Sequence, residues 1–117
     1  MKAVLPLAAV AELATGLALL VAPSLVARLL LGEELAGAGV SVARVLGIAL
    51  IGLGFACWPG PPRLGMVIYG GGVALYLAGL GFAGGPHGAL LWPVVGLHAL
   101  LTALLLRPAK RDGQPRT

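Results

Sequence analysis

The sequence predicts an all-α integral membrane protein in which four transmembrane helices pack as a bundle. The chain has 117 residues, 59% of them hydrophobic and only 10% charged, and its mean hydropathy is +1.01. Its apolar residues fall into four runs of about 20 residues, each long enough to cross a hydrocarbon core of about 30 Å as a helix. This composition is far more apolar than that of soluble domains, so an ordinary soluble domain is excluded.

The apolar runs are separated by residue types that are typical of turns. The four predicted helices cover residues 3–22, 39–58, 64–83 and 88–106. The segments that separate them contain Gly32-Glu33-Glu34, Pro59-Gly60-Pro61-Pro62 and Gly84-Gly85-Pro86. Short connections make sequential helices antiparallel neighbours, so residues 1–107 are expected to form a single transmembrane domain.

The first run could instead be a signal peptide, because Met1 and Lys2 precede it. An uncleaved helix is favoured, since Glu12 interrupts the run and the apolar stretch continues well beyond an ordinary signal core. Residues 24–31 follow a proline and carry Arg28. They are expected to form either a short interfacial helix capped by Ser24 or an extension of the first helix.

Positive charge is unequally divided between the two ends of the predicted bundle. The end with both termini and the second connection holds six of the eight basic residues, namely Lys2, Arg63, Arg107, Lys110, Arg111 and Arg116. This bias predicts that both termini are cytoplasmic. Residues 108–117 are expected to be a disordered basic tail along anionic lipid headgroups. Nucleic acid is not expected as a partner, because the basic residues do not cluster on a soluble face.

Glu12 and His98 are ionisable residues within predicted spans, where a charged side chain costs about 2.5 to 3.5 kcal/mol. Glu12 is nine residues beyond Ala3, and His98 is nine residues before Arg107. At helical rise both lie about 13 Å from the same edge of the bilayer. An acid and an imidazole in one layer could share a proton.

Further polar residues lie near these two and extend them to a predicted polar seam inside the bundle. The seam comprises Glu12, Thr15, Tyr69, Tyr76, His98 and Thr102. Tyr76 lies about 20 Å from the inner edge, too deep for an aromatic belt, so its hydroxyl is expected to need a partner. A structural interpretation, in which a neutral acid hydrogen-bonds histidine or tyrosine and sets helix register, is favoured over a proton-coupled site.

Arg44 lies six residues into the second predicted helix. Its side chain is expected to extend back to the outer interface, and the alternative is an outer-half contact with an anion, with Glu33 or with Glu34. Two histidines and one cysteine lie far apart in the sequence, so neither a metal site nor a cofactor is expected.

Small residues recur four positions apart on the predicted helices, which favours close helix packing in lipid. These sets are Ala43 with Gly47, Gly52 with Ala56, Gly70 with Ala74 and Ala78, and Ala99 with Ala103. The spacing leaves open whether they pack within one chain or between chains.

The first half of the chain carries a pattern seen in one group of small membrane proteins. The residues are Pro23-Ser24-Leu25, Leu31-Gly32, Ala43-Arg44-Val45-Leu46-Gly47-Ile48 and Gly52-Leu53-Gly54. They resemble the corresponding part of the broad DoxX-like group. The resemblance implies a four-helix bacterial inner-membrane protein, in a group that includes subunits of quinone-linked oxidation and membrane assembly factors. It implies no catalytic residue.

Three function classes follow from these observations. An accessory or structural subunit of a membrane complex is the first, with a partner membrane subunit or further copies of the chain as neighbours in the lipid bilayer. A small proton-coupled transporter that uses Glu12 and His98 is the alternative. An enzyme is the least favoured, because no further catalytic cluster accompanies these two residues.

Overall fold

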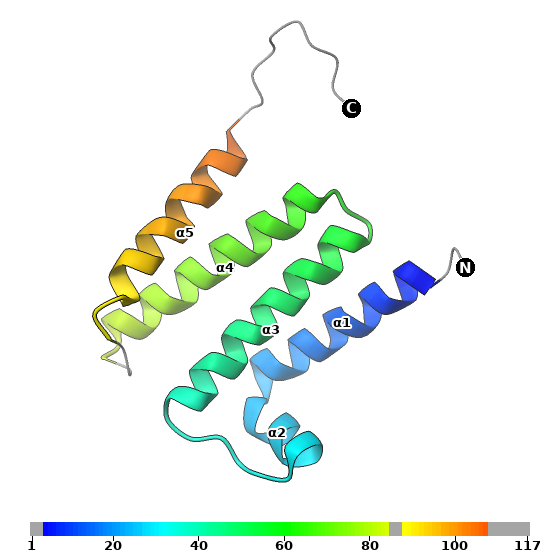
Figure 1. Cartoon of the computed structure of the whole chain (residues 1–117), viewed down its shortest axis with the longest axis vertical. Helices are drawn as coiled ribbons and strands as arrows, with labels where there is room; N and C mark the ends of the chain where they lie inside the picture. The colour runs from blue at the N-terminus through cyan, green and yellow to red at the C-terminus, as the bar shows by residue number, and fades with distance from the viewer. Residues whose placement is uncertain (1–3, 85–87, 108–117) are drawn as a thin grey trace, which may run out of the picture.

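The part of the chain that the computed structural model describes contains five α-helices and confirms the predicted all-α class (Figure 1). The structure describes residues 4–84 and 88–107, so the predicted tail at 108–117 lies outside the described residues. The helices are α1 (Val4–Val21), α2 (Pro23–Leu31), α3 (Ala38–Cys57), α4 (Pro62–Phe82) and α5 (Leu91–Leu106).

Each of the four predicted runs forms a helix, but the helices differ in length. α1, α3 and α4 have 18, 20 and 21 residues and are long and apolar enough to cross a membrane. α5 is apolar but has only 16 residues, or about 24 Å at helical rise against a core of about 30 Å. It is shorter than predicted because residues 88–90 form a turn before Leu91.

The segment after α1 forms a separate short helix, α2, as one of the two sequence alternatives predicted. Ala22 leaves helical geometry at φ −138° and ψ 65°, and Pro23 then occupies the first turn of α2, where its missing N–H costs nothing. The predicted cap by Ser24 is wrong, since Ala22 is the N-cap residue and no side chain caps the helix. Gly32 ends α2 at φ +78°, a left-handed conformation that glycine adopts without strain.

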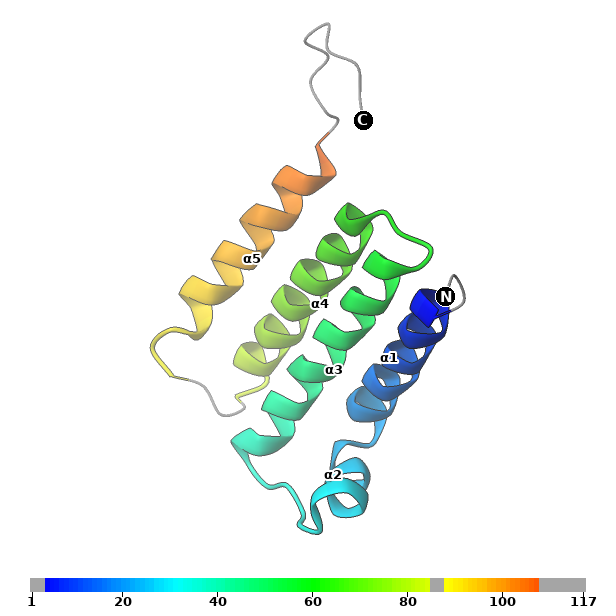
Figure 2. The same cartoon turned by 45° about the vertical axis from the view of Figure 1, so that its right-hand side comes forward.

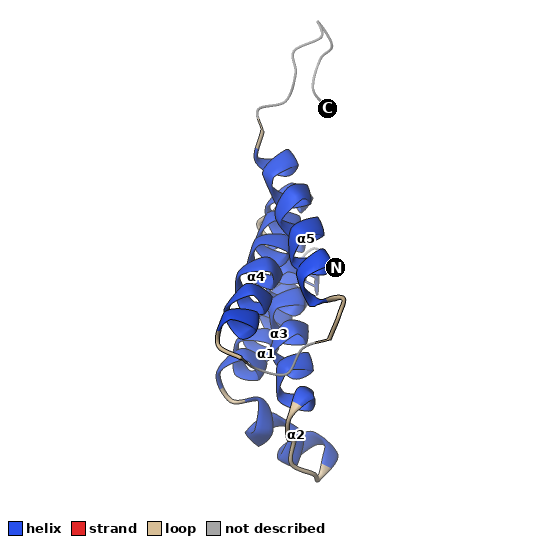
Figure 3. Ribbon diagram, turned by 90° about the vertical axis from the view of Figure 1, so that its left-hand side faces the viewer, coloured by secondary structure: helices blue, strands red, loops and turns tan. Residues whose placement is uncertain are grey.

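The four longer helices lie side by side in one layer, in the order α1, α3, α4, α5, each antiparallel to its neighbour (Figure 2). Among the described residues, α1 contacts α2 and α3 but reaches neither α4 nor α5. The molecule measures 54 by 41 by 15 Å, so it is thin in side view (Figure 3). The predicted antiparallel neighbours are confirmed, and the four longer helices of the predicted bundle form one open layer.

The layer stays open for a physical reason that the sequence pattern does not contain. Short connections dictate only which sequential helices are neighbours. In lipid, closing α1 onto α5 would bring no hydrophobic gain, because acyl chains are as apolar as leucine. Large apolar side chains therefore stay exposed on every helix, as Leu7, Leu29, Leu46, Leu75 and Leu100 illustrate.

Glycines bring the helix backbones together within one chain. A Cβ atom placed on Gly16 would lie 2.6 Å from the carbonyl oxygen of Gly47, and a Cβ on Gly47 would lie 2.6 Å from that of Gly16. α1 and α3 therefore cross where neither helix has a side chain. Gly52 meets Gly65 in the same way between α3 and α4. The sequence left open whether small residues pack within one chain or between chains. The Gly16–Gly47 and Gly52–Gly65 contacts join helices of the same chain.

Candidate functional site

The structure divides the predicted polar seam between the two edges of the layer. Glu12 and Thr15 lie on α1, whereas His98 and Thr102 lie on α5. Since α1 and α5 make no contact within the described part of the chain, Glu12 and His98 do not pair in a single chain. The sequence left open whether the two groups touch, and within one chain they are too far apart to share a proton. Helical rise predicts the depth of a residue, but it does not predict which helices are neighbours.

Glu12 borders a hollow of about 180 Å³ between α1 and α3. Its neighbours there are apolar or weakly polar, namely Leu5, Ala8, Ala9, Leu53, Gly54 and Cys57. Glu12 is partly buried, and no side chain within residues 4–84 and 88–107 hydrogen-bonds or ion-pairs with its carboxyl group. An intramembrane carboxyl without a partner is costly in contact with lipid.

Thr15 does not extend the polarity of Glu12 toward another helix. Its hydroxyl donates a hydrogen bond of 2.9 Å to the carbonyl oxygen of Ala11, one turn earlier on α1. The Thr15 side chain also lines a groove between α1, α2 and α3. Of the two seam residues on α1, only Glu12 therefore has a polar group that is free to bind another helix.

Two residues of the predicted seam, Tyr69 of α4 and His98 of α5, are in contact. Their rings meet edge to face, with centroids 5.6 Å apart and an interplanar angle of 69°. The Nδ1 atom of His98 lies 2.9 Å from the carbonyl oxygen of Val94. Because a carbonyl oxygen only accepts, Nδ1 carries the proton in this contact, which assigns the acceptor role to Nε2 in the neutral ring.

Thr102 lies one turn after His98 and packs against Gly70 of α4. A Cβ atom on Gly70 would lie 2.5 Å from the Thr102 hydroxyl oxygen, so a side chain at this position would force Thr102 to shift. The hydroxyl oxygen is buried and has no hydrogen-bond partner among the described residues. Tyr69, His98 and Thr102 therefore form one polar cluster between α4 and α5.

Tyr76 meets its predicted need for a partner, but not within the predicted seam. Its hydroxyl donates a hydrogen bond of 3.4 Å to the Ser41 hydroxyl oxygen of α3. Ser41 was not among the residues predicted from the sequence. Ser41 lies three residues after the start of α3 and Tyr76 lies six residues before the end of the antiparallel α4. The two depths differ by about 4.5 Å at helical rise, so counting residues places both at the same end of the layer but does not single out the pair.

One broad face of the layer carries polar groups on both sides of a stripe on α3. The stripe consists of Val42, Leu46, Ala49 and Leu53, at helical spacings of four, three and four. Leu53 borders the hollow of Glu12 and also a second hollow of about 180 Å³ that Tyr69 borders. Glu12 and Tyr69 thus flank the stripe, and this surface is named the Leu53 face.

The stripe at the centre of the Leu53 face is uncovered. The exposed fractions are 67% for Val42, 50% for Leu46 and 50% for Leu53. Exposed apolar side chains occur on every helix, so what distinguishes this face is the pair of polar groups, Glu12 and Tyr69, that flank its apolar stripe.

Arg44 does not make the ion pair with Glu34 that was the alternative to an extension toward the outer interface. Glu34 instead pairs with Arg28 of α2, with 3.6 Å between the guanidinium and carboxylate atoms. Arg44 is partly buried, and its Nε atom is buried without a hydrogen-bond partner in the part of the chain that the structure describes. The favoured expectation, an Arg44 side chain that extends to the outer interface, stays a prediction.

No family model, curated protein or solved structure matches the chain. The DoxX-like resemblance of the first half therefore stays a prediction. Within the described ranges, no three histidine, cysteine, aspartate or glutamate side chains come together as they would around a metal ion.

Arg63 has a role that was not predicted from the sequence, where it counted only as one of the basic residues. It lies in the first turn of α4 and reaches the last turn of α5. Its Nε donates to the carbonyl oxygen of Leu105 at 2.6 Å, and Nη2 donates to that of Arg107 at 3.2 Å. The last carbonyls of a helix have no partner in the helix itself, so Arg63 caps α5 from the neighbouring helix.

Replacing Arg63 by glutamine is expected to loosen the last turn of α5. Loss of the capping contacts removes about 1 kcal/mol of local stability, which corresponds to roughly fivefold faster amide exchange in that turn. Hydrogen exchange measured in nanodiscs tests this, with Arg28→Gln on α2 as the matched control. Unchanged exchange at residues 103–107 would contradict the capping role.

Proposed function

We propose that this chain is an accessory or structural subunit of a bacterial inner-membrane complex, with both termini in the cytoplasm. The observation that carries the proposal is the open layer with Glu12 at the border of its exposed Leu53 face. The three helices that are long and apolar enough to cross a membrane support its placement in a bilayer.

The need for a neighbour follows from what surrounds Glu12. A carboxyl group in lipid is costly unless another group hydrogen-bonds it. In a closed bundle that group would come from the same chain, but α1 has only α2 and α3 beside it among the described helices. A donor on a partner protein that covers the Leu53 face would remove this cost.

The distribution of charge supports the proposed orientation. The start of α1, the α3–α4 connection and the end of α5 lie at one end of the layer, and α2 lies at the other (Figure 2). Arg63 and Arg107 are at the first end. Arg28 at the second end accompanies Glu33 and Glu34. An excess of basic residues marks the cytoplasmic side.

The subunit proposal is preferred to a proton-coupled transporter. A transporter built on Glu12 and His98 requires the two groups to exchange a proton, but they lie on helices that do not touch within one chain. The subunit proposal requires only that a partner protein covers the Leu53 face.

The particle extracted from native membranes tests the subunit proposal. The tagged full chain is transferred into nanodiscs without harsh detergent, and the mass of the particle and the identity of every chain in it are determined. We expect a different membrane protein in a fixed ratio to this chain. A particle that contains only copies of this chain would overturn the accessory role.

A further inference from the structure

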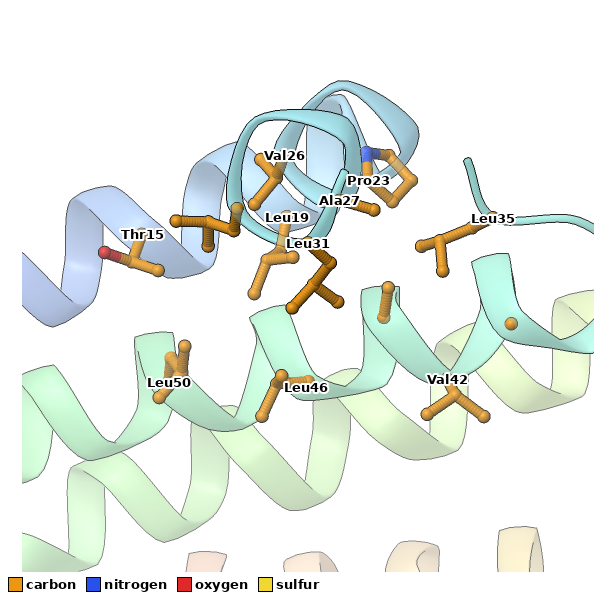
Figure 4. Close-up of a pocket in the computed structure, with 13 residues that line it drawn as sticks. Thr15, Leu19, Pro23, Val26, Ala27, Leu31, Leu35, Val42, Leu46 and Leu50 are labelled. Carbon is orange, nitrogen blue, oxygen red and sulfur yellow. The ribbon is translucent and has the colours of Figure 1, made fainter. Parts of the chain in front are cut away.

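A groove of about 530 Å³ lies on the side of α2 (Figure 4). Residues of α1, α2, α3 and the connection before α3 line it, including Leu19, Val26, Leu31, Leu35, Val42 and Leu46. Its volume is within the range of roughly 300 to 1,000 Å³ that is usual for small-molecule sites. The groove is separate from the polar cluster, but it shares Val42 and Leu46 with one end of the Leu53 face.

The groove offers hydrocarbon contacts to its occupant. Its lining residues are aliphatic or glycine and proline, apart from Thr15. The Thr15 hydroxyl already donates to the Ala11 carbonyl oxygen. A ligand's hydrogen-bonding groups would therefore find only the acceptor lone pairs of the Thr15 hydroxyl here, whereas an alkyl chain needs no hydrogen-bond partner.

The size of the groove favours a single alkyl chain over a partner helix. A helix with its side chains is about 10 Å across and would fill this volume in little more than one turn. α2 also lies over the groove within the same chain, with Leu31 above and Leu46 below (Figure 4). A thin, flexible chain can enter under this cover.

The rim of the groove carries charges that can be matched to a headgroup. Arg28 follows the lining residue Ala27, and Glu34 precedes the lining residue Leu35. The two side chains form an ion pair at 3.6 Å with 54% and 68% of their surfaces exposed, so both are accessible. Glu33 precedes Glu34 in the sequence, so this part of the chain carries one cation and two carboxylates. This balance suits a headgroup with both a phosphate and an ammonium group, and disfavours a purely anionic one.

We propose that the groove binds one acyl chain of a phospholipid whose headgroup carries a phosphate and an ammonium group. The phosphate meets Arg28, and the ammonium meets Glu34. A lipid in this position fills the space under α2 and joins α2 to α3. The proposal does not depend on a partner protein, so a failed subunit proposal leaves it standing.

Photo-crosslinking in nanodiscs tests the proposal with the full chain. The probe is a phosphatidylethanolamine that carries a diazirine on one acyl chain, and labelled peptides are mapped by mass spectrometry. The groove is filled by Gly39→Phe, because a Cβ on Gly39 would lie 3.6 Å from its nearest neighbour, Leu35, an ordinary contact distance. The matched control is Gly79→Phe on α4, since a Cβ there has no atom within 4 Å.

We expect the probe to label α2 and the first half of α3 in the parent chain. Gly39→Phe should lower this labelling about tenfold, and Gly79→Phe should leave it unchanged. A phosphatidylglycerol probe with the same acyl chain should label several times less than phosphatidylethanolamine. Equal labelling of Gly39→Phe and the parent, or equal labelling by the two probes, would overturn the proposal.

A second variant guards against loss of folding in Gly39→Phe. Glu34→Gln leaves the groove itself intact and removes one charge of the rim. It should reduce the preference for phosphatidylethanolamine over phosphatidylglycerol while α2 and α3 remain labelled. An unchanged preference would contradict the assigned role of the rim.

Discussion

Replacing Gly47 by isoleucine is expected to separate α1 from α3 and to destabilise the whole layer. A Cβ on Gly47 would lie 2.6 Å from the Gly16 carbonyl oxygen and 3.0 Å from the Leu20 amide nitrogen. Both neighbours are backbone atoms, which cannot rotate away as a side chain can. Overpacking of this kind costs about 1 to 3 kcal/mol and more where the backbone must move. Equilibrium unfolding in mixed micelles should register this loss.

The matched control for Gly47→Ile is Gly96→Ile on α5. A Cβ on Gly96 has no atom within 4 Å, so the same change of residue meets open space. Both variants carry the same difference in helix propensity between glycine and isoleucine. Similar unfolding free energies for the two variants would refute the close crossing of α1 and α3.

Replacing Leu53 by tryptophan is expected to release the proposed partner from the Leu53 face. Leu53 lies between the hollow of Glu12 and that of Tyr69, and half of its surface is exposed. A larger ring at the centre of an interface disturbs the residues that carry most of the binding energy. We expect the partner recovered with the chain in nanodiscs to fall about tenfold, the change produced by a loss of roughly 1.4 kcal/mol.

Leu75→Trp on α4 provides the control for Leu53→Trp. Leu75 is 78% exposed and lies two residues from Leu77, which borders a hollow shared with Val42. Two residues turn a helix by about 200°, so Leu75 is on the opposite side of the layer. Partner recovery should match the parent chain. If Leu75→Trp releases the partner and Leu53→Trp does not, the partner binds the other face.

The candidate site was only partly predictable from the sequence. Burial depth follows from counting residues along a helix, and it led to the correct expectation that the Tyr76 hydroxyl needs a partner. The partner itself, Ser41, depends on how α3 and α4 face each other. Helix rotation depends on close contacts such as that of Ile48 with Gly72, which a single sequence does not encode in any simple pattern.

The sequence by itself determined the helical class, the positions of the apolar runs and the antiparallel order of neighbours. Each follows from local composition and short connections, which act within a few tens of residues. The separate α2 was one of two alternatives that Pro23 allowed, and the backbone break at Ala22 decided between them.

Only the tertiary structure decided that the helices form an open layer and that Glu12 and His98 lie at opposite edges of it. The physical reason is the solvent. In water, burial of apolar surface would drive four apolar helices to close on one another, and their amphipathic pattern would show which faces meet. In lipid that drive is missing, so glycine contacts between backbones decide the arrangement, as Gly16 with Gly47 illustrates.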